Sequence, residues 1–553
     1  TIEGSSTSKL SFTGSTASTL NMDQTTSGTT NVLQNLTVNG SGGLTLGNSL
    51  QLIGVLTLSN GTLTTGGNLR LIATSPTAYG QISPDGSGSI SGSITMEKEL
   101  SNVTAGWRQI ALPLTNTLDQ LTGINMLDTT HSTANQRNVY LWDASQGSVT
   151  NESKGWRSAT LTSDNQTSAY AVYGNNSSNN LHDIKDSLWF TGTYTHSASA
   201  SFNIYDYLDP LRGAASNASG WNLIPNPYPS NISLSYLFYD NDLSGLTYKG
   251  IHVWDAVNNQ YLAIMKSGAN INYNTSNTSS NTILAPFQAF WVKADGTGTG
   301  AGNTTFTVPK AARVTRTDSL GTFMKRSLDL ARLDVYDKDQ KRDQMVVYFE
   351  SEASSQFDPS YDAYKLLSLE NSVPSIYSVS PEGLFSINAL NSNQFTHSVP
   401  VGFRSNKTGN VNFSLNTTEL DQKWFVYLED KSLGIFYDLR EKPYSFNHSQ
   451  NSDTRFVLHF QTWALSAEKV IGQVDEMQIS GDGDQVFVFN PSHFREQNFK
   501  MEVYDLSGRL VLQNQQLQLM HGMNKLNLAL PQSFYIVKIT CAEGTYSGKV
   551  FIR

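Results

Sequence analysis

The chain has 553 residues, of which 38% are hydrophobic, 10% aromatic and 15% charged. This length predicts roughly three to five domains, and the apolar content is high enough for buried cores, which excludes a disordered chain. The net charge of −9 argues against a nucleic-acid partner. Ser, Thr, Asn and Gly are abundant and long helical periodicity is nearly absent, so we predict an all-β fold.

Cysteine and hydropathy set two further limits. Cys541 is the single cysteine, which rules out an internal disulfide and a multi-cysteine zinc site. No apolar run has the length of a transmembrane helix, so we expect no transmembrane segment. The sequence begins at Thr1, which is consistent with a removed leader peptide or with further sequence upstream.

Residues 1–98 contain a short repeat. Leucine-rich triplets alternate apolar and polar residues and recur mostly every six to eight positions: Leu36–Val38, Leu44–Leu46, Leu50–Leu52, Leu56–Leu58 and Leu69–Leu71. This spacing is too short for ordinary hairpins and predicts the rungs of a β-solenoid or β-helix with inward leucines. A small meander sandwich is the alternative. Residues 84–100 are a candidate cap for the end of the repeats.

Residues 99–312 read as a degenerate duplication, with one copy at 99–205 and the other at 206–312. "GWRQIALPL", "VYLWDAS" and "SAYAVYG" of the first copy match "GWNLIPNPYP", "IHVWDAV" and "QAFWVKADG" of the second. The matched order predicts two related β-units, each with a tryptophan-anchored core. The tryptophans Trp107, Trp142, Trp221 and Trp254 are expected in those cores, and the alternative is that they are sugar-binding platforms.

The rest of the chain continues as β structure. Strand-like runs such as "DQMVVYFE" and "WFVYLEDK" predict a β-sandwich over residues 313–463. Residues 464–479 look like a linker. Residues 480–553 form a last compact β-unit, in which "MEVYDLSGRLVLQ" (501–513) carries a clear hairpin signal.

No catalytic motif stands out, so we predict that the protein is not an enzyme and binds no cofactor. The nine histidines are scattered, and the nucleophile elbow, the P-loop and the Rossmann fingerprint are absent from the sequence. Asp358 and Asp362 are a weak calcium candidate, for which a turn with solvated carboxylates is the alternative. Arg70 is the only charged residue between Asp23 and Asp85, which argues against a polysaccharide lyase on the repeats.

The last unit resembles the type A C-terminal sorting domain of proteins that the type IX secretion system of Bacteroidota exports. The family's hairpin motif matches residues 503–511, its Tyr-containing strand matches 530–539, and its terminal Lys-Val strand matches 549–553. Ser533 stands where the family has glycine. The sorting-signal positions that the resemblance implies are Tyr504, Asp505, Gly508, Arg509, Tyr535, Lys549 and Val550.

This resemblance implies an Ig-like last domain that serves as a folded export signal. It implies shuttle or translocon proteins of the secretion system as partners, and a location at the cell surface or outside the cell. The strand Lys549–Arg553 is a candidate for recognition by strand addition, and the alternative is that it only closes the sandwich. A weaker resemblance to Bacteroidota O-glycosylation motifs predicts sugar on Thr129, Ser187 or Ser319.

Together these expectations describe an exported surface protein with an adhesive or structural passenger. Modular β architecture without a catalytic cluster is the basis for that reading, and surface glycans or further copies of the chain are possible partners. A carbohydrate-binding or polysaccharide-degrading surface protein is the alternative function.

Overall fold

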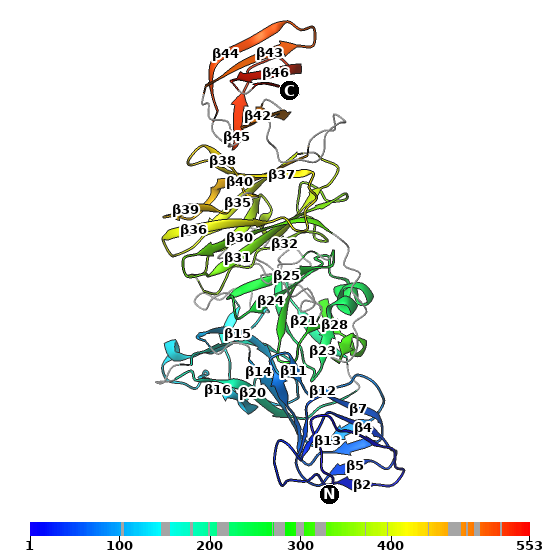
Figure 1. The fold of residues 1–553 in the computed structure, drawn as a ribbon. Coiled ribbons are helices and arrows are strands. Elements are labelled where there is room, and N and C mark those ends of the chain that lie inside the picture. Colours follow the sequence, from blue (N-terminus) through cyan, green and yellow to red (C-terminus); the bar gives the residue numbers. More distant parts are fainter. Residues whose placement is uncertain are drawn as a thin grey trace. The chain divides into compact units, whose positions relative to one another are not determined.

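A computed structural model gives the fold of the chain, and its strands confirm the all-β prediction (Figure 1). The structure describes residues 1–100, 104–144, 155–176, 181–196, 199–206, 220–267, 269, 283–294, 304–315, 328–370, 372–394, 396–440, 442–462, 477–482, 485–490, 498–519, 522–542 and 544–552. Most of the predicted linker, at 464–476, lies outside these residues. Within them, no helix is long and apolar enough to cross a membrane.

The chain divides into two compact units. The first contains residues 1–326 together with 358–370, and the second contains 327–357 together with 371–553. These units are coarser than the six segments that the sequence predicts. The short segment 358–370 belongs to the first unit although its neighbours in sequence on both sides belong to the second.

The N-terminal repeats form three parallel sheets of short strands. The first is β1 (Lys9–Phe12), β4 (Asn35–Asn39), β7 (Val55–Asn60) and β12 (Gln81–Ile82); the second is β2 (Ser18–Leu20), β5 (Leu44–Leu46), β8 (Thr62–Thr64) and β13 (Ser89–Ser91); the third contains β3 (Val32–Leu33), β6 (Leu50–Leu52), β9 (Leu69–Leu71) and β14 (Ile94–Glu99). From β1 to β9 every third strand returns to the same sheet in parallel register, for example Leu36 beside Leu56. After the hairpin of β10 (Ala73–Ser75) and β11 (Ala78–Tyr79), the strands β12, β13 and β14 continue the three sheets. A meander would pair its strands antiparallel, so the pairing excludes that alternative.

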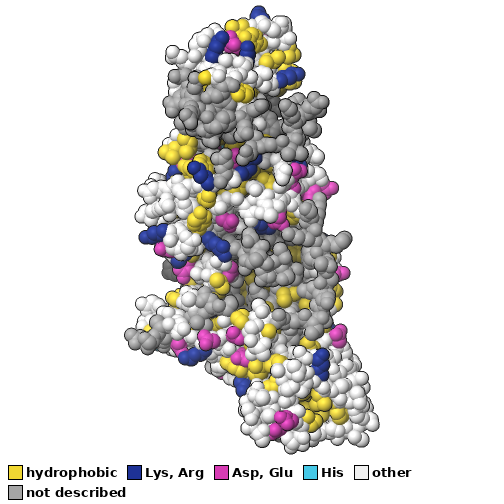
Figure 2. Space-filling model, viewed as in Figure 1, with side chains coloured by type: hydrophobic (Ala, Val, Ile, Leu, Met, Phe, Trp, Pro, Cys, Tyr) yellow, Lys and Arg dark blue, Asp and Glu magenta, His cyan; other side chains and the backbone are white. Residues whose placement is uncertain are grey.

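Leucines explain why these short strands stack. Within each strand, inward and outward side chains alternate, and the inward ones are fully buried: Leu36, Leu50, Leu52, Leu56, Leu58, Leu63, Leu69 and Leu71 are 0% exposed. A fully buried leucine contributes about 1.5–3 kcal/mol, which offsets the small number of hydrogen bonds that each short strand makes. The outward side chains are mostly uncharged, and Figure 2 shows few charged groups on this end of the visible surface.

The third parallel sheet continues into the first copy of the duplication. β14 pairs in parallel with β9 on one side and antiparallel with β20 (Ile184–Gly192) on the other, and β20 pairs with β16 (Leu121–Ile124). One hydrophobic core runs from the parallel sheets through both copies. The predicted segments 1–98, 99–205 and 206–312 therefore share a single core.

Each copy of the duplication builds a four-stranded antiparallel sheet of the same topology. The first has the order β15 (Gly106–Ala111), β19 (Ala169–Gly174), β17 (Val139–Trp142), β18 (Trp156–Ser158); the second has the order β22 (Trp221–Pro225), β27 (Ala289–Lys293), β24 (Gly250–Asp255), β25 (Gln260–Met265). The cross-strand partners correspond as well: Trp107–Tyr173 and Trp221–Lys293, Tyr140–Ala171 and His252–Trp291, Trp142–Trp156 and Trp254–Tyr261.

Shorter elements complete the first unit. They are the strands β10 (Ala73–Ser75), β11 (Ala78–Tyr79), β21 (Ala200–Ile204), β23 (Asn231–Ser233), β26 (Ile283–Leu284), β28 (Thr304–Val308), β29 (Arg313–Val314) and β32 (Ala363–Tyr364), with the short helices η1 (Leu118–Gln120), η2 (Ala134–Gln136), η3 (Tyr236–Asp240), η4 (Asp242–Gly245) and η6 (Lys310–Ala312).

The second unit begins with one large sheet around its own core. Its strands are β30 (Asp329–Asp337), β31 (Arg342–Glu350), β33 (Ser375–Ser380), β34 (Gly383–Asn391), β35 (Thr396–Arg404), β36 (Gly409–Asn416), β37 (Trp424–Asp430), β38 (Ile435–Asp438), β39 (Tyr444–His448) and β40 (Ser452–Thr462). They follow one continuous path from β38 to β39, and side chains from all along it meet in one hydrophobic core.

The last domain is a small sandwich with a core of its own. One sheet is β41 (Gln478–Asp482), β42 (Gln485–Asn490) and β45 (Gly522–Asn527); the other has the order β44 (Leu510–Gln518), β43 (Asn498–Asp505), β46 (Ser533–Cys541), β47 (Gly544–Ile552). Their inner faces enclose a core that includes Val488, Val503 and Val537. β47, the predicted recognition strand, is an edge of its sheet; Arg553 lies outside the described residues.

Candidate functional site

The hairpin of the last domain is held by one aspartate. The Asp505 carboxylate accepts hydrogen bonds from the Ser507 and Arg509 backbone amides, both at 3.0 Å, and from the Arg509 guanidinium at 3.1 Å. The hydrogen bonds from Ser507 and Arg509 hold the pKa of Asp505 below its usual value. Gly508 follows with φ +83°, in the left-handed region where glycine has no steric cost. Asp505, Gly508 and Arg509 therefore form one rigid turn.

Two of the predicted sorting residues belong to the core instead. Tyr535 and Val550 are 4% and 2% exposed. The Tyr535 hydroxyl donates to the backbone oxygen of Pro531 at 2.8 Å, so the phenol is fixed inside the domain. These two side chains shape the sandwich but present little surface to a partner.

The other motif residues lie on the exposed side of the same sheet. Tyr504 has Leu510 as its cross-strand neighbour on one side and Ile536 on the other, and Lys549 lies opposite Ile536. Two residues away on the same face, Phe534 lies opposite Phe551, and their ring centroids are 4.8 Å apart. We call Tyr504, Leu506, Leu510, Phe534, Ile536, Lys549 and Phe551 the apolar outer face.

The apolar outer face is unusual for this chain. Nine large hydrophobic side chains are exposed among the described residues, and four of them, Leu506, Leu510, Phe534 and Ile536, lie here at 40–61% exposure. The Lys549 ammonium lies 4.5 Å from the centroid of the Phe534 ring, which adds a charge to the face. Figure 2 shows hydrophobic and basic side chains together on the visible side of this domain. Such patches on an otherwise polar surface mark interaction sites.

The four predicted tryptophans join the two copies of the duplication. The Trp142 indole donates to the Trp221 backbone oxygen, and the Trp254 indole donates to the Trp107 backbone oxygen, each at 2.7 Å. Trp221 and Trp254 are each 6% exposed. The rings also meet neighbouring aromatic rings, as Trp142 does with Trp156 at 5.3 Å. Trp221 and Trp254 therefore belong to the core, and the indoles of Trp142 and Trp254 join the two copies, which argues against sugar platforms for these three.

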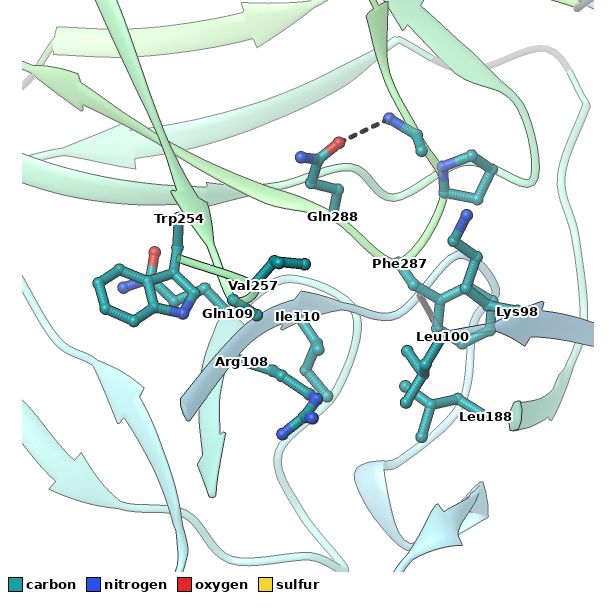
Figure 3. A pocket seen from close by; sticks show the side chains of 13 residues that line it. Lys98, Leu100, Arg108, Gln109, Ile110, Leu188, Trp254, Val257, Phe287 and Gln288 are labelled. Carbon is teal, nitrogen blue, oxygen red and sulfur yellow. Dashed lines mark hydrogen bonds between the residues drawn. The ribbon is translucent and has the colours of Figure 1, made fainter. Parts of the chain in front are cut away.

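A pocket of about 230 Å³ lies where the two copies meet (Figure 3). β14 and β15 supply one side, and the second copy supplies the other from the end of β24 and the turn before β27. Its lining consists of Lys98, Leu100, Arg108, Gln109, Ile110, Leu188, Trp254, Ala256, Val257, Ala285, Pro286, Phe287 and Gln288. Val257 is 53% exposed, so the pocket is open to solvent beside this residue.

Comparison with known proteins identifies a family for most of the chain. Residues 13–460 match the family described as a domain of unknown function, DUF8693. The chain belongs to the DUF8693 family. No curated protein matches the sequence. The DUF8693 match ends before the last domain begins, so the sorting-domain motif lies in a separate part of the chain.

Solved structures with similarity to this DUF8693 protein were also found, and two of them are as follows. Tp47, the 47-kilodalton lipoprotein of Treponema pallidum, is 10% identical over 40% of this chain and 86% of that one, with a TM-score of 0.12. A biofilm-associated protein, BSP domain, is 10% identical over 84% of this chain and 66% of that one, with a TM-score of 0.13. At these TM-scores neither likeness bears on fold or function.

The predicted O-glycosylation sites of the DUF8693 region differ in access. Thr129 is exposed, next to Asp128, whose carboxylate accepts from the backbone amides of Thr130 and Leu161 at 2.9 and 2.8 Å. Burial acts to raise the pKa of Asp128, but these hydrogen bonds outweigh it and lower the pKa. Ser187 is half-buried within β20, and Ser319 lies outside the described residues. Thr129 is the more accessible of the two described sites.

The calcium candidate is a local turn. The Asp362 carboxylate accepts from the backbone amide of Asp358 at 2.7 Å, and the Asp362 side chain is buried. Among the residues that the structure describes, no three metal-binding side chains of His, Cys, Asp or Glu gather at one place. The geometry supports the turn, but the expectation of solvated carboxylates is wrong for Asp362, which is buried.

One polar constellation was missed by the sequence analysis. The Ser398 hydroxyl lies 2.9 Å from Nδ1 of His459, and Nε2 of His459 lies 2.9 Å from the Glu429 carboxylate. This hydrogen bond with His459 lowers the pKa of Glu429. The three residues come from β35, β40 and β37, and no short motif could have linked them. A Ser–His–carboxylate chain resembles a hydrolase triad in composition.

The surroundings of His459 favour a structural role for this chain of hydrogen bonds. The imidazole packs 5.4 Å from the Phe436 ring and 6.4 Å from the Phe487 ring, and Phe487 belongs to β42 of the last domain. His459 thus lies where the last domain meets the large sheet, and the hydrogen bonds fix its ring against this contact.

Proposed function

We propose that this DUF8693 protein is a non-enzymatic protein of the cell surface or the extracellular space, exported by a type IX secretion system. The last domain is the folded export signal, which shuttle or translocon proteins bind through the apolar outer face. The passenger, residues 1–462, acts through its folded surface in adhesion or as a structural element.

The apolar outer face is the observation that carries this proposal. Motif residues Tyr504 and Lys549 lie on it, the Asp505–Arg509 turn ends it, and it belongs to a domain with a separate core. Exposed apolar side chains cost solubility, so a protein retains them where a partner covers them. An export receptor that reads folded cargo needs such a fixed surface.

The test is export of the full chain in a bacterium that has a type IX system. The variant F534S/I536S removes two side chains that are 44% and 40% exposed, so we expect a folded protein that stays in the periplasm. L433S is the matched control, because Leu433 is 61% exposed but lies in the large sheet's β37–β38 turn. Protease treatment of intact cells reports surface exposure, and melting of the purified variants reports folding.

Two outcomes separate the alternatives. Surface exposure of wild type and L433S, with folded F534S/I536S retained inside, supports the export role of the face. If folded F534S/I536S reaches the surface as wild type does, the face is not the recognition surface and the proposal fails.

A further inference from the structure

The pocket between the two copies is cationic. Lys98 and Arg108 are the charged residues of its lining, and none of the lining residues is acidic. Figure 3 shows Lys98 and Arg108 on different sides of the lining, with the apolar side chains of Ile110, Leu100 and Phe287 between them. The Lys98 ammonium donates to the Pro76 backbone oxygen and lies 4.2 Å from the centroid of the Tyr79 ring. The pocket therefore has positive charge without a carboxylate in its own wall.

Arg108 is the more deeply placed cation. Its side chain is 6% exposed, and its guanidinium donates to the backbone oxygens of Gly106 and Thr104, both at 2.9 Å. Burial lowers the pKa of Arg108, which shows that its charge is poorly hydrated here. A bound anion would stabilise such a charge, because charge-assisted hydrogen bonds are strongest where water is excluded.

The second copy shows that the fold does not need an arginine at this position. Asn222 is the counterpart of Arg108, one residue after the matched tryptophan. Its amide donates to the Gly220 backbone oxygen at 2.8 Å, as Arg108 does to Gly106. The Asn222 side chain also accepts a hydrogen bond from the Tyr205 backbone amide and donates one to the Tyr205 backbone oxygen. In the second copy a neutral amide makes the hydrogen bonds that the backbone needs at this position. The charge of Arg108 is therefore not required by the fold and is specific to the pocket.

The turn before β27, which forms the opposite wall of the pocket, also differs from the equivalent turn of the first copy. Gln288 N–H donates to Ala285 O at 3.2 Å, and Ser168 N–H donates to Asn165 O at 3.1 Å, so each copy closes a four-residue turn at this point. In the pocket turn Phe287 has φ +64°, while its counterpart Thr167 does not adopt positive φ. A phenylalanine in this region carries strain of about 1–3 kcal/mol, which is typical of ligand-binding sites.

We propose that this pocket binds a small molecule with an apolar ring or chain and one carboxylate. The carboxylate lies toward Arg108, and the apolar part contacts Ile110, Leu188 and the strained Phe287. The volume of about 230 Å³ is below the 300–1,000 Å³ typical of drug-sized ligands, so the ligand is small. This inference goes beyond the proposed function, because it concerns the passenger and not its export.

Benzoate is the probe, and benzyl alcohol is its uncharged counterpart. Saturation-transfer NMR on the full chain measures binding to wild type and to R108N, which installs the residue of the second copy. K185N is the matched control, since Lys185 is an exposed cation in the same unit and its side chain is 69% exposed. We expect benzoate to bind wild type and K185N alike, and R108N about tenfold more weakly, because a charge-assisted contact is lost.

A second variant covers the case in which R108N perturbs the fold. A256W places a large side chain at a half-buried position of the lining and should abolish benzoate binding while both cations stay in place. The proposal is overturned if benzyl alcohol binds as well as benzoate, or if R108N and A256W leave binding unchanged. It is also overturned if wild type shows no benzoate binding at about 10 mM, above the millimolar Kd expected for so small a ligand.

Discussion

The two copies of the duplication share a backbone and differ in chemistry. Strand order and cross-strand partners agree, and each copy donates one indole hydrogen bond to the other. The side chains at three equivalent positions differ in character. Arg108 of the first copy corresponds to Asn222 of the second, Tyr140 to His252, and Thr167 to Phe287. Strand pairing and the tryptophan hydrogen bonds maintain the shared scaffold. A few side-chain positions can therefore differ between the copies in charge, in the ability to titrate or in backbone strain.

The largest expected effect tests the tryptophan anchors. Trp254→Ala should destabilise the first unit by about 3–5 kcal/mol, because a buried ring and its hydrogen bond are lost. Trp142→Ala should cost less, since Trp142 is half-buried whereas Trp254 is 6% exposed. Calorimetric melting of the full chain measures both, and a larger cost for Trp142→Ala would show that the anchors are not ranked by burial.

Swapping one matched pair tests whether the two sites are equivalent. Asn222→Arg should cost about 3 kcal/mol or more, because it places a charge at a position 3% exposed whose amide already bonds three backbone groups. Arg108→Asn should cost less, about 1–2 kcal/mol, since the amide can reproduce the bond to Gly106 while the bond to Thr104 is lost. Equal costs for the two substitutions, measured by urea denaturation, would contradict the asymmetry.

His252 of the second copy, which corresponds to Tyr140 of the first, predicts that the stability of the second copy decreases in acid. Burial, with Lys365 adding repulsion, lowers the pKa of His252 to about 3. The unfolded chain takes up a proton near pH 6.5 but the folded one does not, so stability falls as the pH drops below 6.5. At pH 5 the loss is about 2 kcal/mol.

Melting temperatures between pH 7 and pH 5 measure this effect. His252→Gln keeps an acceptor for the Tyr248 hydroxyl, which lies 2.6 Å from Nε2, and should flatten the pH dependence. Identical pH profiles for wild type and His252→Gln would rule out His252 as the source.

The smallest expected effect concerns the energetic cost of a positive φ angle, which Phe287 adopts. A glycine with a positive φ elsewhere in the chain gives a reference value for this cost. Gly508 of the last domain has φ +83° and open space where a Cβ would stand, so Gly508→Ala measures the backbone cost alone. We expect about 1 kcal/mol from the last domain's transition in guanidinium chloride. A cost near zero would mean that Phe287 stores little strain and would weaken the contrast with Thr167.

Much of the fold was predictable because its signals are local. The leucine triplets predict short buried strands, and the matched tryptophan motifs predict two related sheets. "DLSG" predicts the turn that Asp505 and Gly508 close. The triplets and the turn depend on residues within a few positions of one another, and the duplication is visible because the same short motifs recur in the same order, so a single sequence is enough to recognise them.

The sites were harder to predict because they combine distant residues. The Trp254 indole and Trp107 oxygen are 147 positions apart, and Ser398 and His459 are 61 apart. The pocket draws its lining from residues 98 to 288. Tyr535 and Val550 entered the predicted sorting signal through a motif, but a motif does not separate core positions from surface positions. Only the strand register does so.

The reciprocal indole bonds also set an order on folding. The Trp142 bond spans 79 positions and the Trp254 bond spans 147, so neither bond can form before residues of the second copy have been synthesised. Contacts of such long range slow folding, because the chain must close large loops before it gains their energy. The first copy therefore lacks both of these bonds until the second copy is available, and a chaperone would protect this chain chiefly in that interval.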